Sequence, residues 1–163
     1  FWTWRTEEVL DMVEWMRKFN QPKQRIEFTG FDMQYYSGAT DELLHMFKGD
    51  EETENKINRL KNILSEISNR AQLNRGVITI EDNEKKETDA IISLLQKRIE
   101  TATFQTVGKT WLQQNIVIIQ QYLGSNNYAW RDKCMADNFL WIKEQNPDSK
   151  FTIWAHNAHI PVS

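Results

Sequence analysis

Two histidines close together near the carboxyl end are the residues best suited to chemistry. His156 and His159 are two of only three histidines in the 163-residue chain, and they follow the apolar segment 151–155. Histidine is well suited to proton transfer near neutral pH and is also a common metal ligand. A lone histidine at the end of a strand more often has a structural role, in which it bonds backbone carbonyl oxygens, than a chemical one. For this pair, which flanks Asn157, we favour a site.

The histidine pair does not specify a metal. Zinc hydrolases use a third ligand and commonly a helical H-E-x-x-H motif, which the sequence lacks. The spacing therefore does not predict a metal or other cofactor. A metal-dependent hydrolase that uses His156, His159 and Asp32 as ligands is the alternative.

Charged residues elsewhere could complete such a site. Arg131 and Asn138 lie seven residues apart on one helical stripe that is otherwise apolar. An arginine there needs a carboxylate or a ligand to compensate its charge, although it could also reach water or pair with Asp132. Asp32 could orient a histidine or bind a cationic ligand group, or it could cap the turn before the next helix. Both interpretations of each residue stay open.

Two helix–loop–strand units are expected to position these residues. Thr6 and the carboxylates after it predict the start of an amphipathic helix over 6–19, and a second helix is expected over 131–144. Each is followed by an apolar segment, 25–31 in the first unit and 151–155 in the second. Segment 151–155 is nearly continuous in apolar residues, as in strands that are buried on both faces of a parallel sheet.

Units of this kind build an α/β fold, here helix-rich, with a mostly parallel sheet and long helices packed on it. Only six glycines and three prolines interrupt the chain, which favours long helices. Apolar spacing predicts further helices over 38–47, 57–67, 88–99 and 112–123. Segment 76–80 is either a strand or a loop. Because ligands bind beyond the carboxyl ends of parallel strands, we expect Asp32 and the histidine pair to converge at one sheet edge.

The composition argues against several classes of protein. A formal net charge of −3 and a pI near 5.7 argue against a nucleic-acid binder. No apolar run approaches the roughly 20 residues that span a bilayer, so we expect no membrane protein. The single cysteine, Cys134, excludes an internal disulfide and fits a reducing compartment, so we expect a cytoplasmic protein. No G-x-S-x-G elbow, phosphate-binding glycine loop or dinucleotide motif supports a serine hydrolase or nucleotide enzyme.

The two ends of the sequence are unusually apolar. The chain begins with Phe1 and Trp2, and it stops three residues after an apolar stretch. Chain ends usually lie exposed, where such residues are uncommon. We therefore expect residues 1–163 to be the middle part of a single larger domain, incomplete at both ends, which contacts missing upstream and downstream parts of its own chain.

Motifs at both ends of the chain resemble one family. In order they are W-x-T-E-E at 4–8, W-M-R-x-x-N at 15–20, F-x-G-F-D-M-Q at 28–34, R-D-x-x-M-A-x-N at 131–138 and W-A-H-N-A-H-I at 154–160. This order and wording resemble the erythromycin esterase-like family, some members of which are labelled succinoglycan biosynthesis proteins. The last two motifs are the most specific, and residues 40–125 carry no pattern of the family.

The resemblance implies metal-independent hydrolysis of a small-molecule ester, in the best-known members the lactone of macrolide antibiotics, and hence antibiotic resistance. In such a family a histidine acts as general base on a water molecule in a deep cleft. The resemblance implies catalytic roles for His156 and His159. It also implies that Asp32, Arg131 and Asn157 are cleft residues that bind substrate.

The sequence departs from the family at the general base. The family's base is a histidine in an upstream G-E-x-x-H-G motif, which these 163 residues do not contain. The resemblance therefore implies that the base comes from outside this chain and that the chain alone is inactive. A non-catalytic member that binds a small molecule or a saccharide is the second alternative.

Overall fold

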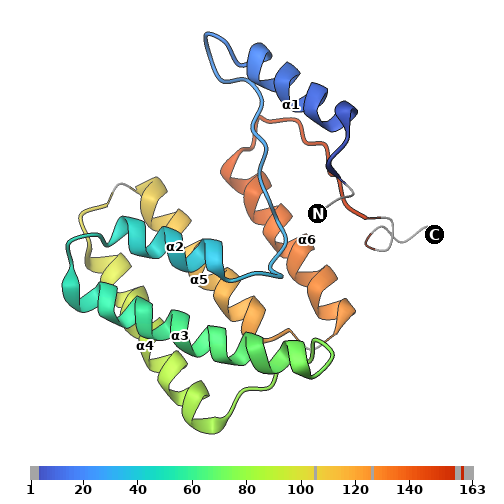
Figure 1. Ribbon diagram of the computed structural model, residues 1–163. Helices are drawn as coiled ribbons and strands as arrows, with labels where there is room; N and C mark the ends of the chain where they lie inside the picture. Colours follow the sequence, from blue (N-terminus) through green and yellow to red (C-terminus); the bar gives the residue numbers. More distant parts are fainter. Residues whose placement is uncertain (1–3, 105, 126, 157–158, 160–163) are drawn as a thin grey trace. The chain divides into compact units, whose positions relative to one another are not determined.

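The computed structural model describes residues 4–104, 106–125, 127–156 and 159. Six α-helices lie within these residues (Figure 1): α1 (Glu7–Phe19), α2 (Ser37–Met46), α3 (Glu51–Leu73), α4 (Asp82–Thr101), α5 (Thr106–Leu123) and α6 (Tyr128–Gln145). No strand occurs among the described residues, so the predicted α/β fold with a mostly parallel sheet is wrong. The described chain is all-helical.

Segments 25–31 and 151–155, which we predicted as strands, carry no regular secondary structure. Asn20 explains part of this at the first segment, because its side chain bonds the backbone groups that a neighbouring strand would use. Its Nδ2 donates to the carbonyl oxygen of Ile26 at 2.8 Å, and its Oδ1 accepts from the N–H of the same residue at 2.9 Å. In the second segment Ile153 is 49% exposed, unlike a strand buried on both faces.

The helices lie close to where the apolar spacing predicted them. α1 begins after the predicted cap, since the Thr6 Oγ1 accepts from the N–H of Val9 at 3.4 Å. α4 starts earlier than predicted because the charged stretch before it forms the first turns of the helix. There the Glu84 carboxylate accepts from the N–H of Glu81 at 3.0 Å, which satisfies a backbone donor at the helix start. Segment 76–80 is not a strand.

The chain divides into two compact units, Phe1–Gly30 and Phe31–Ser163. The first unit contains α1, which has no buried residue. Leu10 and Val13 are exposed apolar side chains on this helix, and the rings of Trp15 and Phe19 stack with their centroids 5.3 Å apart. The predicted helix over 6–19 is thus confirmed, but its described residues bury no core within this unit.

The second unit contains the hydrophobic core. Its packing pairs are α2 with α3, α2 with α5, α3 with α4 and α4 with α5 (Figure 1). The side chains that fill the space between these helices include Leu43, Leu60, Ile67, Leu95, Ile99, Leu112, Ile116 and Ile119. Met33 is also fully buried in this core. The chain directly after Asp32 is therefore anchored against the helices.

α6 is attached to the end of α5 by a tryptophan. The indole Nε1 of Trp130 donates to the carbonyl oxygen of Gln121 at 2.9 Å. A Cβ atom at Gly124 would lie 2.7 Å from Trp130 Cζ2, so glycine is what leaves room for the ring. α6 also buries Cys134 and Asn138, and burial raises the pKa of the Cys134 thiol. That cysteine packs in the interior rather than serving as a nucleophile.

Candidate active site

His159 is paired with a carboxylate on α6. Its Nδ1 lies 2.6 Å from Oδ1 of Asp132, and the histidine side chain is 12% exposed. An ionised carboxylate only accepts hydrogen bonds, so beside such a group Nδ1 would be the donor of the pair. In the neutral ring this leaves Nε2 as the acceptor. The pair is the arrangement that orients a histidine for proton transfer.

The His159–Asp132 pair borders an apolar pocket of about 300 Å³. The pocket is lined by Phe31, Asp132, Met135, Ala136, Phe139, Ile153, Ala155 and His159. The rings of Phe139 and Phe151 meet edge to face, with their centroids 5.6 Å apart, so an aromatic contact holds segment 151–155 against α6. A polar pair at the edge of an apolar hollow is typical of small-molecule sites.

Arg131 binds Asp32 with both arms of its guanidinium group. Its Nε donates to Oδ1 at 3.1 Å and its Nη2 donates to Oδ2 at 2.6 Å, across 99 residues of sequence. The hydrogen bonds that Arg131 donates to Asp32 raise the pKa of the arginine above its usual value. Asp32 also accepts from the N–H of Gln34 at 3.2 Å, so it both pairs with the arginine and caps its turn. The hydrogen bonds of the Arg131 guanidinium described here go to Asp32, whereas the Asp132 carboxylate bonds His159.

Asn138 forms the centre of a buried amide network beneath this pair. Its Nδ2 donates to the carbonyl oxygen of Phe31 at 3.0 Å and to Oε1 of Gln121 at 2.9 Å. Its Oδ1 accepts from the side-chain amides of Gln121 and Gln114, each at 2.9 Å. Because Phe31 precedes Asp32 and lines the pocket, Asn138 fixes the backbone at both.

The structure brings some of the predicted site residues together. His159, Asp32 and Arg131 each bond or adjoin a residue that lines the pocket. His156 is exposed and is not in the described pocket lining, and Asn157 lies outside the described residues. The predicted convergence of Asp32 and the histidine pair at a sheet edge is wrong, because the described residues contain no sheet.

Asp132 was not predicted as a site residue. The sequence offered it only as a possible partner of Arg131, yet it is the residue that bonds His159. Neighbouring residues of a helix point in directions about 100° apart, so an adjacent arginine and aspartate seldom serve the same partner. The adjacency of Arg131 and Asp132 on a predicted helix therefore indicated that the two residues would have different partners.

The described residues do not favour the metal alternative. No three of their histidine, cysteine, aspartate and glutamate side chains gather into a group that could hold a metal ion. Asp32, one of the three ligands considered, has both carboxylate oxygens bonded to Arg131. The donor set of the alternative is therefore not assembled in this part of the chain.

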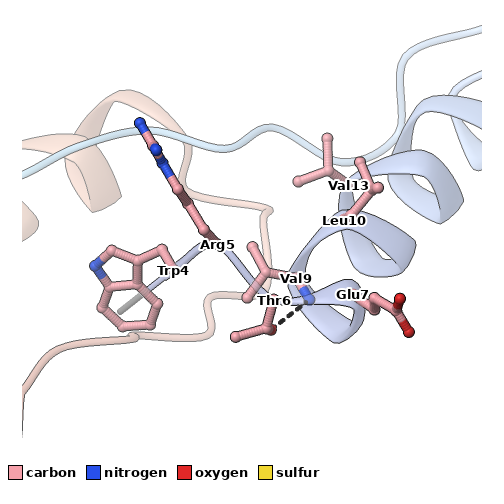
Figure 2. Close-up of a pocket in the computed structure, with 7 residues that line it drawn as sticks. All are labelled: Trp4, Arg5, Thr6, Glu7, Val9, Leu10 and Val13. Atoms are coloured by element: carbon pink, nitrogen blue, oxygen red, sulfur yellow. Dashed lines mark hydrogen bonds between the residues drawn. The ribbon is translucent and has the colours of Figure 1, made fainter. Parts of the chain in front are cut away.

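A second hollow, of about 470 Å³, lies in the first unit (Figure 2). It is lined by Trp4, Arg5, Thr6, Glu7, Val9, Leu10 and Val13. Figure 2 shows the Thr6 oxygen accepting from the backbone N–H of Val9, which is a helix cap. Because these seven residues include no histidine or thiol, we place the candidate chemistry at the pocket beside α6 instead.

None of the helices in the described residues has the length and apolar character required to cross a membrane.

The arrangement of His159, Asp132 and an apolar pocket is of the kind found in hydrolases that act on small molecules. A family model described as erythromycin esterase matches residues 1–162. The chain belongs to the erythromycin esterase family, and the resemblance seen in its motifs is confirmed. Searches of curated proteins and of solved structures found no match.

Proposed function

We propose that this protein hydrolyses a carboxylic ester or lactone without a metal, with His156 and His159 in catalytic roles. The observation that carries the proposal is the His159–Asp132 pair at the edge of an apolar pocket, in a chain that belongs to a family of esterases. The pocket suits the uncharged part of an ester, and the histidine is oriented by its carboxylate.

The chemistry requires proton transfer at two points. Water adds to the ester carbonyl carbon as its proton passes to a base, and the bond to the alcohol oxygen then breaks as that oxygen takes the proton. Through Nε2, His159 can hold the attacking water or donate to the negative oxygen of the intermediate, while Asp132 stabilises the ring's positive charge. His156 supports the same step. Asp32, Arg131 and Asn157 bind substrate beside it.

The general base is proposed to lie outside these 163 residues. The resemblance assigns it to a histidine in a G-E-x-x-H-G motif, and the sequence contains no such motif. In this proposal residues 1–163 are the middle part of one esterase domain. A protein that lacked the base altogether would instead bind a small molecule without cleaving it.

Kinetics of p-nitrophenyl ester hydrolysis test the proposal. A protein that joins the upstream motif to this chain should be active, and His156→Ala or His159→Ala should lower its turnover about 10²–10⁴-fold. His45→Ala on α2 is the control, with turnover expected to stay unchanged. Residues 1–163 alone should be no faster than free imidazole at equal concentration.

Three outcomes would overturn parts of this assignment. Full activity of residues 1–163 alone would make one of their own histidines the base. Stoichiometric zinc, with activity lost on chelation and restored by metal, would establish the metal-dependent alternative. An inactive longer protein that still binds neutral esters would identify a binding protein.

A further inference from the structure

The pocket beside α6 is apolar on almost every side. Six of its eight lining residues have apolar side chains, and the other two, Asp132 and His159, are bonded to each other. Among the described residues, the lining contains no lysine or arginine. A carboxylate or phosphate placed there would lose its hydration and face Asp132, so the lining selects against a negative charge.

The size of the pocket restricts the occupant further. Pockets that bury most of a drug-sized ligand have volumes of about 300–1,000 Å³, and this one, at about 300 Å³, lies at the lower limit. Phe31, Met135 and Phe139 supply large side chains to its walls, while Ala136 is the smallest side chain that α6 contributes. A short alkyl or a single aromatic group fits such a space.

We propose that the pocket binds a compact, uncharged apolar group joined directly to the ester, so that the preferred substrates are neutral esters with one short alkyl or aryl arm. The inference rests on the proposed function for its substrate class. It adds that the ester bond lies at His159 while the apolar arm occupies the space between Phe31, Met135 and Phe139.

Neutral amides test the inference because they resemble esters but resist hydrolysis. Residues 1–163 are titrated with acetamide, butanamide, hexanamide and succinamate, and with N-alkylacetamides that carry the same arms on nitrogen. Histidine ring signals are followed by NMR. In at least one series, affinity should rise about two- to fourfold per methylene and then level off, with the His159 signal shifting. Succinamate, which carries a charge at the end of its arm, should bind no better than acetamide.

A substitution at Ala136 localises the binding. Ala136→Leu places a larger side chain in the pocket and should weaken hexanamide binding at least fivefold while changing acetamide binding less than twofold. Ala129→Leu is the matched control, because Ala129 is an exposed residue in the first turn of the same helix and does not line the pocket.

The test separates this inference from the proposed function. Flat affinities in both series, equal binding of succinamate or no effect of Ala136→Leu would overturn the inference, whereas His159-dependent turnover would still support the esterase. Selective binding of neutral amides by a longer protein without turnover would support the pocket assignment and refute the esterase.

Discussion

The side-chain amide of Asn138 holds the backbone of Phe31, which lies 107 residues earlier in the sequence, with Nδ2 donating to the carbonyl oxygen at 3.0 Å. Asn138 does not line the pocket, but Phe31 does, and the next residue is the partner of Arg131. One buried amide thus fixes both a wall of the pocket and the position of Asp32. The loss of this amide should therefore be felt in the stability of the protein.

Asn138→Ala should lower the free energy of unfolding by roughly 1–3 kcal/mol, because Gln121, Gln114 and the Phe31 carbonyl would lose partners in a buried setting. Urea denaturation measures the loss. Asn146→Ala is the control: its amide bonds the Ile142 carbonyl at an exposed helix end, so we expect a loss below about 1 kcal/mol. Equal losses in the two variants would show that the network has no special role.

Arg131→Lys should not be conservative, since lysine cannot reproduce the two parallel bonds to Asp32. We expect reduced ester turnover in the longer protein that carries the upstream motif, with the helical circular dichroism unchanged. Arg59→Lys is the control, because Arg59 binds Glu87 with the same two-armed geometry but is not in the pocket lining. Unchanged kinetics in the Arg131 variant would leave its ion pair a purely structural feature.

Asp132→Asn should reduce turnover by about tenfold or more, because the amide no longer fixes the His159 ring through an ionised acceptor. The measurement is again p-nitrophenyl ester turnover by the longer protein that carries the upstream motif. Asp137→Asn is a suitable comparison, since Asp137 is exposed on the same helix and forms an ion pair with Lys133. If both variants lose the same activity, Asp132 does not orient a catalytic histidine.

Glu84 should make stability depend on pH in acid. Burial raises its pKa, but the hydrogen bond from Arg70 and the N–H of Glu81 outweigh burial and leave the pKa below its usual value. A lowered folded-state pKa contributes stability above the unfolded pKa, near 4.5, and this contribution is lost as the pH falls below it.

Glu84→Gln should therefore cost roughly 1–2 kcal/mol of unfolding free energy at pH 7, and less at pH 3. The expected loss of unfolding free energy is modest because the Arg70 side chain is 36% exposed, so that solvent screens its ion pair with Glu84. Asp89→Asn, at an exposed pair with Lys85 on the same helix, should change little at either pH. A Glu84→Gln loss that is independent of pH would contradict the argument.

The helices were predictable because their signals are local. The cap at Thr6 and the apolar stripe after it lie within one segment, and α1 runs from Glu7 to Phe19 where 6–19 was predicted. The predicted strands were wrong because a strand needs a neighbouring strand as its hydrogen-bond partner. At Ile26 the backbone groups bond the Asn20 side chain instead. A segment rich in apolar, β-favouring residues would fit a pleated, half-buried sheet. Its composition does not show that a sheet is present in the fold.

The candidate site was partly predictable because residue type and local position are visible in the sequence. They singled out His159, Asp32 and Arg131. The pairing of Arg131 with Asp32 joins positions 99 residues apart, and that of His159 with Asp132 joins positions 27 apart, so neither follows from local pattern. The catalytic roles of His156 and His159 and the substrate-binding roles of Asp32, Arg131 and Asn157 stay predictions.

The two bonds that cross about a hundred residues, from Asn138 to Phe31 and from Arg131 to Asp32, also have a consequence for the order of folding. Contacts of such high sequence separation require closure of a long loop, whereas each helix and its neighbours form from short-range contacts. We expect the α2–α5 bundle to form first and the pocket to be assembled last, on the native side of the folding barrier. In stopped-flow kinetics, Asn138→Ala should then speed unfolding and leave the refolding rate nearly unchanged. Newly made chains would accordingly pass through a collapsed, helical stage before the pocket beside α6 exists.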